Sequence, residues 1–572
     1  MAMPHGGRLV RSLDRPALVA LGLGLVGIGY RLVLILLDVP GSNSDEATFG
    51  LAAMHIADGR ELPVFLYGQH YMGTVEAFLA APLFALFGPS WVLLRIPLLF
   101  LFAVFVYLTY RLTRQLYSPW LATFTVGLLA LGSERVIRDQ ITAVGGRPEI
   151  KPAVVGLLLL AVALGQRRIR HRWWAFGLFG LIAGLCVWDD WLVLPYLAVA
   201  VGVLLLGAWR DLFGVASPAL IGGFLLGVAP LIVDNLTAPP GQDTISVLLQ
   251  ISAGETEGTA AADRLHGAVL VGIPLATGLC PSDRCLPWQA WWGGLYLVLL
   301  LVAAALALVG LLRRGRPPDE RSGQPDGGPP DDRSGQPDGG RLDEPSGEPA
   351  DQARRAARVR YAAQLALPVA AAVTMFAYSR SSLAASAPLA SARYLSILQI
   401  SLPAVLWPLW LVARWSGRVT AKPAVRASGV LAATVLTVLV AFLLSTTAGM
   451  IGQIRSIRVE ERQARELAEA LQRAGIGQVY GDYWTCNRLI FMARERVVCA
   501  VLGETLQPGQ DRYAAYPREV QAADRPAFVF TADEPADTAF RAHLRQHAID
   551  ATVTEIGEHR VYRPSTTIRP SR

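Results

Sequence analysis

Charged residues are scarce in this chain, and their scarcity excludes an ordinary soluble protein. Only 17% of the 572 residues are charged, while 53% are hydrophobic. Soluble domains carry about a quarter charged residues. Several apolar runs reach the roughly twenty residues that a helix needs to cross a bilayer. Because unpaired backbone groups are not tolerated in lipid, the sequence predicts a polytopic α-helical membrane protein.

Signals for other classes are missing as well. No GxxxxGK[ST] pattern follows a predicted strand, which argues against a P-loop nucleotide site. Residues 17–37 are too long for a signal-peptide core and lack a small-residue cleavage site, so we expect a retained span. The net charge of +7 comes largely from arginines in short loops between apolar runs. That pattern is typical of a membrane protein, and no nucleic-acid partner is predicted.

About eleven spans are expected. They cover residues 17–37, 91–112, 119–134, 150–166, 173–188, 191–209, 215–234, 290–312, 361–379, 394–413 and 427–449. Basic loops precede the first span and follow the second, fourth, eighth and tenth. A cytoplasmic N-terminus places all of these loops in the cytoplasm, as the positive-inside rule requires. We therefore expect a multi-pass protein of the plasma (inner) membrane whose C-terminal domain is extracytoplasmic.

Three segments differ from the spans. Residues 38–90 form the first outer loop, with a helix near 46–57 and an apolar stretch at 75–88 that is too short to span, so we expect a re-entrant or interfacial helix. Residues 316–352 contain RSGQPDGG twice and predict a disordered cytoplasmic linker. The membrane domain, residues 1–449, is followed by a mixed-polar region, residues 450–572, which predicts a small α/β domain.

The order of elements in this last region can also be predicted. An amphipathic helix at 458–475 ends at a glycine. Short strands are expected at 478–484, 496–501 and 526–532, a helix at 536–548, and a final strand or hairpin at 552–564.

There are five cysteines. Cys280 and Cys285 lie in a long outer loop, and Cys486 and Cys499 in the outer domain. An even count outside the cytoplasm suggests two disulfides. A metal site at CPSDRC is a weaker interpretation, because no partnered His or Cys pair stands nearby. Cys186 lies in a span, where we expect plain packing.

Polar residues at span ends gather on the extracytoplasmic side of this topology. They are Asp45, Glu46, Gln69, His70, Arg147, Glu149, Asp189, Asp190, Asp234, Arg393 and Tyr394. Ionisable groups at a membrane boundary are functional candidates by default. Their position on one side points to reaction chemistry there.

Four short motifs resemble the GT-C superfamily of polyprenyl-phosphate-sugar-dependent glycosyltransferases, which includes protein O-mannosyltransferases and lipid A aminoarabinose transferases. They are Asp45-Glu46 after the first span, G-Q-x-Y-x-G at Gly68–Gly73 followed by Glu76, LLRIP at Leu93–Pro97, and ARYL at Ala392–Leu395. DYWTCNRLIF at 482–491 resembles a recurring segment of the outer domain in bacterial members. The likeness covers most of residues 15–450 in layout.

The resemblance implies an inverting transfer of a sugar from a polyprenyl-phosphate donor to an extracytoplasmic glycan, lipid or protein. Asp45 would then be the base that takes the acceptor proton. Glu46 would orient the site or help to bind a divalent metal ion. Arg393 would clamp the phosphate, since a guanidinium matches phosphate oxygens bidentately. Tyr394 would add a hydrogen bond.

Further candidates follow from the same resemblance. Arg95 and Arg147 would bind the donor phosphate as well. Substrate contacts are expected from Gln69, His70, Tyr71, Glu76, Glu149, Asp189 and Asp190. No obvious metal cluster stands in the sequence, and no second histidine is suitably spaced for His70 to hold a metal, so dependence on a divalent metal ion stays open.

Each assignment has a structural alternative. Ser44 or Asp45 would suit the N-cap of the helix that follows. Arg393 would snorkel from a span end, and Asp189-Asp190 would form an interfacial loop in a tryptophan belt. For the whole chain the alternative is a multi-pass transporter or lipid flippase, which would more often show inverted repeats. No internal symmetry of that kind is visible in the sequence.

Overall fold

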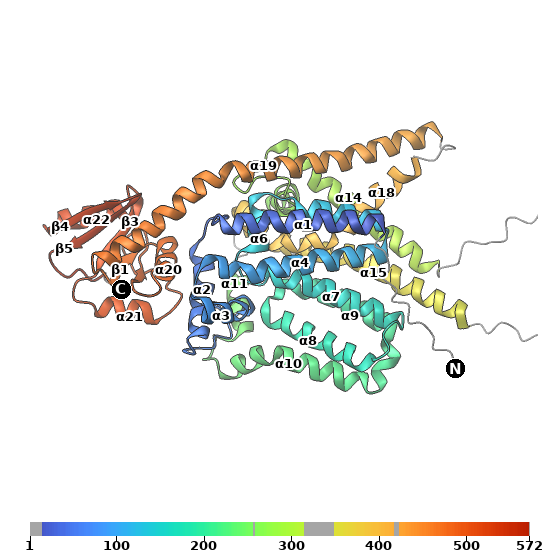
Figure 1. Cartoon of the computed structure of the whole chain (residues 1–572), viewed down its shortest axis with the longest axis horizontal. Helices are drawn as coiled ribbons and strands as arrows, with labels where there is room; N and C mark the ends of the chain where they lie inside the picture. The colour runs from blue at the N-terminus through green and yellow to red at the C-terminus, as the bar shows by residue number, and fades with distance from the viewer. Residues whose placement is uncertain (1–13, 255–257, 314–347, 417–421, 571–572) are drawn as a thin grey trace, which may run out of the picture.

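A bundle of long apolar helices carries a small α/β domain at one end (Figure 1). The computed structural model describes residues 14–254, 258–313, 348–416 and 422–570. The first thirteen residues and most of the predicted linker 316–352 lie outside these ranges, and residues 348–352 already belong to a helix. In Figure 1 the chain ends that flank residues 314–347 lie at the opposite end of the bundle from the α/β domain.

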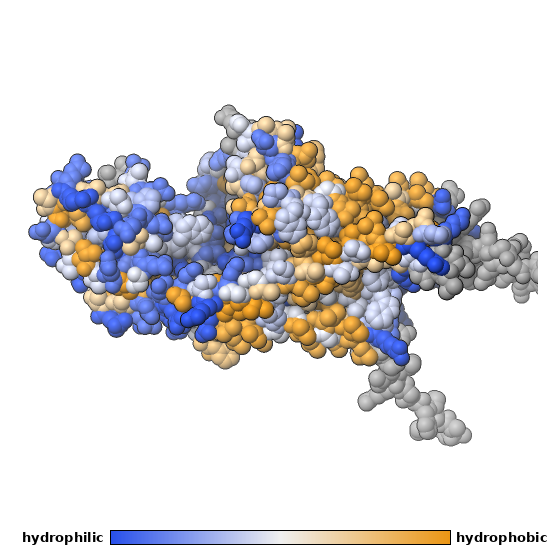
Figure 2. Space-filling view, turned by 90° about the horizontal axis from the view of Figure 1, so that it is seen from above, coloured by the Kyte–Doolittle hydropathy of each residue, from blue (hydrophilic) through white to orange (hydrophobic). Residues whose placement is uncertain are grey.

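Within the described residues, nine helical segments are long and apolar enough to cross a membrane. They are α1 (Arg15–Leu36), α4 (Trp91–Leu116), α7 (Arg147–Gly165), Trp191–Phe213 around α9 (Leu194–Ala208), α10 (Ala216–Thr237), Pro287–Leu312 around α14 (Trp291–Leu312), α15 (Glu348–Arg380), Pro388–Ser416 and α19 (Pro423–Arg473). Figure 2 shows hydrophobic residues gathered over this bundle and hydrophilic residues over the α/β domain.

Two of the eleven predicted spans, 119–134 and 173–188, do not pass this test of length and hydropathy as single helices. The first corresponds to the pair α5 (Pro119–Ala130) and α6 (Glu134–Ile141), which passes the test together but is bent by 96° at residues 131–133. The remaining prediction, 173–188, corresponds to α8 (Arg172–Asp189), which packs along α10. Its tryptophans and its charged ends lower its hydropathy below that of the other spans.

A buried arginine of α1 stabilises the bend between α5 and α6. Arg31 donates to the carbonyl oxygens of Leu129 at 3.1 Å and Ala130 at 2.9 Å, and to the side chain of Gln140 at 2.6 Å. The last carbonyls of a helix have no partner inside the helix. Arg31 supplies partners for them within the bundle, where water is scarce.

The segment between the first two spans folds as predicted into two short helices. They are α2 (Ser44–Ala57) and α3 (Val75–Phe87), the latter apolar but too short to span. The N-cap of α2 is Asn43, whose side chain accepts a hydrogen bond from the Glu46 amide at 2.9 Å. The alternative in which Ser44 or Asp45 caps this helix is therefore wrong.

The second half of the bundle contains several short elements near the end that carries the α/β domain. They are α11 (Thr244–Gly254), α12 (Ala261–His266), the π-helical turn η3 (Gly267–Gly272), α13 (Ile273–Ala276), α16 (Leu383–Ser386), α17 (Pro388–Ser391) and the 3-10 helix η5 (Ala392–Ser401), which leads into the longer α18 (Leu402–Ser416). A 3-10 run as long as η5 is uncommon. It carries the ARYL segment.

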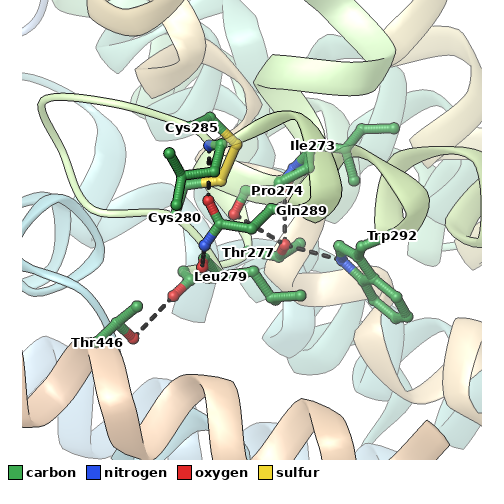
Figure 3. The surroundings of a disulfide bond; sticks show 11 residues. Ile273, Pro274, Thr277, Leu279, Cys280, Cys285, Gln289, Trp292 and Thr446 are labelled. Carbon is green, nitrogen blue, oxygen red and sulfur yellow. Dashed lines mark hydrogen bonds between the residues drawn. A yellow bond between two sulfur atoms is a disulfide. The ribbon is translucent and has the colours of Figure 1, made fainter.

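Both predicted disulfides are present, Cys280–Cys285 and Cys486–Cys499. Figure 3 shows the loop that the first one closes. The Gln289 side chain donates to the Leu279 carbonyl and accepts from the Leu286 amide, both at 2.8 Å. These bonds tie the disulfide loop to the start of α14.

The α/β domain follows the end of α19, and we call it the outer domain. The predicted span 427–449 and the predicted amphipathic helix form this one continuous helix, which ends before Gly475 at φ +67°. The sheet has the order β2-β1-β3-β5-β4, with β1 (Gln478–Gly481), β2 (Val498–Val501) and β3 (Ala527–Thr531) parallel and the hairpin β4 (Ala551–Ile556) and β5 (His559–Pro564) antiparallel. Helices α20 (Tyr483–Met492), α21 (Ala515–Ala522) and α22 (Pro535–Gln546) connect the strands.

This domain shares a hydrophobic core with the membrane-side helices. The ring of Phe491 in α20 lies 4.4 Å from that of Trp91 in α4, and also packs on Phe84 of α3. A Cβ at Gly50 of α2 would come within 2.6 Å of Phe491. The close fit of α20 on α2 sets the position of the outer domain above the first outer loop.

Candidate functional site

A cavity of roughly 560 Å³ lies where the bundle meets the outer domain. Its walls come from α2, the loop 66–72, the start of α7, residues 190–195, α11, the end of α15, the start of η5 and the outer domain. Most of the lining is apolar. The charged side chains in it are Asp45, Arg147, Asp190, Arg393 and Arg512.

Asp45 projects from the first turn of α2 and is held by two donors from the outer domain. Its Oδ1 accepts a hydrogen bond from the Tyr483 hydroxyl at 2.6 Å and from Arg512 Nη2 at 3.1 Å. Arg512 Nε in turn donates to the Tyr483 oxygen at 2.8 Å. The side chain of Asp45 is 29% exposed, and no hydrogen bond among the described residues uses its Oδ2. That oxygen is available to accept a proton from a bound molecule.

The same network keeps Tyr483 in its neutral form. Burial, followed by the neighbouring Asp45 carboxylate, raises the pKa of Tyr483 to about 12. Its hydroxyl therefore remains a hydrogen-bond donor to Asp45 across the whole neutral range.

Arg393 has no carboxylate partner among the described residues. Its guanidinium stacks on the Tyr394 ring, 5.3 Å from the centroid, and makes a long hydrogen bond of 3.4 Å to the Tyr394 hydroxyl. Its Nε is buried without a partner. Its charge interacts with that of Asp45. A buried guanidinium with spare donors is a natural anion site.

Two glycines bring Arg147 and Asp190 together at the cavity wall. Gly145 and Gly146 have φ of +77° and +71°, and a Cβ at Gly146 would lie 2.4 Å from that of Asp190. This tight turn starts α7 and aims Arg147 into the cavity, where it also pairs with Asp139 at 3.1 Å. Burial raises the pKa of Asp190 to about 6, although the hydrogen bond from the Leu192 amide acts in the opposite direction and lowers it.

The other member of the acidic pair, Glu46, faces the interior. It forms a two-pronged ion pair with Arg95 at 2.7 Å and 2.6 Å, and neither residue lines the cavity. Their side chains are 0% and 1% exposed. The predicted roles of Glu46 in catalysis and of Arg95 in phosphate binding therefore do not fit this geometry, because each is neutralised by the other away from the cavity.

The remaining candidates divide into three groups. Gln69, Tyr71 and Tyr394 line the cavity. His70 and Glu76 do not; His70 accepts from Thr244 through its backbone carbonyl, and Glu76 accepts from the amides of Val144 and Gly145. Glu149 and Asp189 line a separate groove on the other side of the cavity wall.

Glu46 is the one residue expected to help to bind a divalent metal ion, and the sequence leaves metal dependence open. Within the described ranges, no group of three or more His, Cys, Asp or Glu side chains is arranged to hold a metal ion. Glu46, the proposed ligand, is occupied by Arg95.

Arg512 and Tyr483 were missed by the sequence analysis. The resemblance singled out the segment 482–491, which contains Tyr483, without a role for that residue. Arg512 lies 467 residues from Asp45 in the chain, and no motif marks it. Its Nη1 is buried without a partner, and its side chain is only 9% exposed.

Comparison with solved structures identifies the fold. The chain overlays on ArnT from Cupriavidus metallidurans bound to undecaprenyl phosphate with a TM-score of 0.53, at 14% sequence identity, over 96% of this chain and 97% of ArnT. The apo state of that ArnT gives a TM-score of 0.54 at 13% identity, over 95% and 98% of the two chains. No family model matches the sequence, and no curated protein does. The likeness shows that this chain shares the fold of ArnT, and it confirms the predicted architecture of a multi-pass helical bundle with a small C-terminal α/β domain.

Proposed function

We propose that this protein is an inverting membrane glycosyltransferase. It moves a sugar from a polyprenyl-phosphate donor to an acceptor hydroxyl or amine on the outer face of the plasma (inner) membrane. The observation that carries the proposal is one cavity that contains a carboxylate with a free oxygen, Asp45, and an unpaired guanidinium, Arg393. The undecaprenyl phosphate bound to ArnT, which has the same fold, supports this class of donor.

Asp45 is the proposed general base. Its Oδ2 takes the proton from the acceptor as the acceptor oxygen or nitrogen attacks the anomeric carbon. The bond between that carbon and the phosphate oxygen breaks on the opposite face, and its electron pair stays with the leaving phosphate. Proton transfer by a positioned base contributes about 10²–10⁴-fold to rate.

The guanidinium groups are the proposed phosphate site. Arg393 has the largest unused hydrogen-bonding capacity, and Arg147 and Arg512 add positive charge around the same cavity. Charge that develops on the leaving phosphate is stabilised by donors already in place, in a cavity whose walls are mostly apolar. Gln69, Tyr71 and Asp190 are left to contact the sugar or the acceptor.

The site is proposed to lie on the extracytoplasmic side of the membrane. The N-terminus, the linker 316–352 and the arginine-rich loops would lie in the cytoplasm. The cavity and residues 450–572 would lie outside, where the outer domain supplies Arg512 to the donor site.

Sugar transfer in membranes tests the proposal. Wild type, Asp45→Asn and Arg393→Ala are compared at equal protein level with radiolabelled polyprenyl-phosphate sugars. Asp45→Asn should lower transfer by about 10²–10⁴-fold, and Arg393→Ala by about 10²–10³-fold. Asp58→Asn, at the exposed end of the same helix α2, and Arg380→Ala, exposed at the end of α15, should transfer like wild type. Transfer that survives Asp45→Asn would remove Asp45 as the base.

A further inference from the structure

A second hollow of roughly 640 Å³ lies behind the wall of the cavity, between α3, α4, α7 and α8. We call it the lateral groove. Its apolar lining consists of Val75, Phe78, Leu79, Leu101, Val104, Leu108, Ile150, Pro152, Ala153, Gly156, Ile182, Leu185, Cys186 and Trp188. A groove with this lining suits a hydrocarbon chain.

Two buried carboxyl groups, Glu149 and Asp189, stand at the polar end of the lateral groove. They are 8% and 2% exposed. The two carboxyl groups lie close enough to hydrogen-bond to each other, and the amides at the start of α7 lie near Glu149, but no other side chain among the described residues donates to any of their four oxygens. Glu76, Asp190 and Glu149 all add negative charge around Asp189. Buried polar groups are nearly always hydrogen-bonded, so two adjacent buried carboxyl groups with oxygens to spare point to a ligand that donates to them.

The wall between the two hollows is polar on both faces but of opposite character. Arg147 and Asp190 face the cavity, while Glu149 and Asp189, from the same two segments, face the lateral groove. The cavity side gathers three guanidinium groups, whereas the groove side presents only carboxyl groups. A phosphate is attracted to the first and repelled by the second.

We propose that the lateral groove binds a long-chain lipid whose head carries hydrogen-bond donors, a hydroxyl or an ammonium group. The chain packs on the apolar lining, and the head donates to Glu149 and Asp189. Pockets of this kind pair a mostly apolar lining with a few convergent polar groups. The lateral groove lies behind the wall of the cavity that contains Asp45, so the lipid is a second ligand of the bundle, and its binding does not depend on the proposed function.

Photo-crosslinking tests the proposal without any sugar transfer. The full chain in lipid nanodiscs is incubated with three diazirine-bearing probes of equal chain length, an alcohol, an amine and a monophosphate ester. Labelled peptides are then mapped. The alcohol and the amine should label residues 149–156 and 182–189 about tenfold more than the phosphate does, the factor for one charge-assisted hydrogen bond. Equal labelling by the phosphate, or none by any probe, overturns the proposal.

Gly156 offers a variant that fills the groove. A Cβ there meets only Leu108 Cδ1, at an ordinary 3.8 Å, so Gly156→Phe should enter the groove without displacing the backbone. It should reduce labelling by the alcohol to the level of the phosphate. Gly202→Phe on α9, where a Cβ meets nothing within 4 Å, is the matched control and should leave labelling unchanged. Labelling that persists in Gly156→Phe also overturns the proposal.

The carboxyl groups are tested by the double variant Glu149→Gln and Asp189→Asn, which keeps their shape. It should abolish the preference of the groove for the amine over the phosphate; a preference that persists overturns the role of the carboxyl groups. Because probe binding is measured in the absence of donor, failure of the groove proposal and failure of the transferase proposal are distinguishable.

Discussion

The cavity and the interior beside it each contain a carboxylate–guanidinium pair, and the two pairs begin at neighbouring residues. Asp45 and Arg512 meet at the cavity through one carboxylate oxygen, with Asp45 29% exposed. Glu46 and Arg95 meet in the interior through a two-pronged contact, with both residues at most 1% exposed. The first pair leaves an oxygen for chemistry, whereas the second uses its carboxylate to neutralise a buried charge. On the proposed function, the same residue types therefore serve the reaction in one region and folding in the other.

The largest effect should come from breaking the interior pair. Glu46→Gln leaves Arg95 buried without a counter-charge, and removing one partner of a buried pair costs about 3–5 kcal/mol. The double variant Glu46→Gln and Arg95→Met should recover most of that loss, because no buried charge remains. The free energy of unfolding in detergent measures both.

The free energy of unfolding of Asp45→Asn should be measured alongside that of Glu46→Gln. Asp45→Asn removes a partly exposed charge from the cavity and should change stability by less than about 1 kcal/mol, while transfer collapses. If Asp45→Asn destabilised the protein as strongly as Glu46→Gln, the two pairs would not differ in role.

A smaller effect is expected at Arg512, the guanidinium that only the outer domain supplies. Arg512→Ala removes an anion-binding donor and one of the two bonds that hold Asp45. Transfer should fall by about 30–100-fold, somewhat less than for removal of a full oxyanion donor. Arg512→Lys keeps the positive charge but loses the bidentate geometry of the guanidinium. Its transfer rate should therefore lie between those of wild type and Arg512→Ala. The exposed Arg494→Ala, next to α20, is the control and should transfer normally.

Tyr483→Phe should be milder still. It removes the shorter of the two hydrogen bonds to Asp45 and keeps the ring on which Arg512 stacks at 5.5 Å. One hydrogen bond to a charged group is worth about 1.5 kcal/mol here, or roughly tenfold in transfer. Unchanged transfer by Tyr483→Phe would mean that Tyr483 does not act on Asp45.

Much of this architecture was predictable because it depends on local pattern. Long apolar runs and the short stretch at 75–88 led to the bundle, and Gly475 marked the end of α19. The site was only partly predictable. Asp45 and Glu46 are adjacent in sequence, and their separation into cavity and interior depends on the direction of the first turn of α2, which Asn43 caps. Arg512 reaches the cavity only through the tertiary docking of α20 on α2.

The last and smallest effect concerns a second attachment of the outer domain, at Glu495. Burial raises the pKa of this carboxyl group, but hydrogen bonds from His55 at 2.9 Å, Arg60 at 2.5 Å and Tyr516 at 2.9 Å outweigh burial and lower the pKa to about 2. A group with a lowered folded pKa contributes stability above its unfolded pKa, near 4.5. That contribution is lost as the pH falls from about 4.5 to about 2. After allowance for solvent screening it is worth about 1 kcal/mol.

The Glu495 attachment distinguishes the two carboxylate–guanidinium pairs, because only the Asp45–Arg512 pair includes a residue of the outer domain. Acid should loosen the outer domain and with it the Asp45–Arg512 contact, while the Glu46–Arg95 pair stays closed. Hydrogen exchange at pH 5 and pH 3, with each rate divided by the intrinsic amide rate at the same pH, should therefore show lower protection factors in α20 and α21 at the lower pH, with those of α4 unchanged. Glu495→Gln should already show lowered protection factors in these helices at pH 5, because it lacks the charge that acid removes. If Glu495→Gln kept the wild-type difference between the two pH values, another group would have to carry the acid sensitivity of the interface.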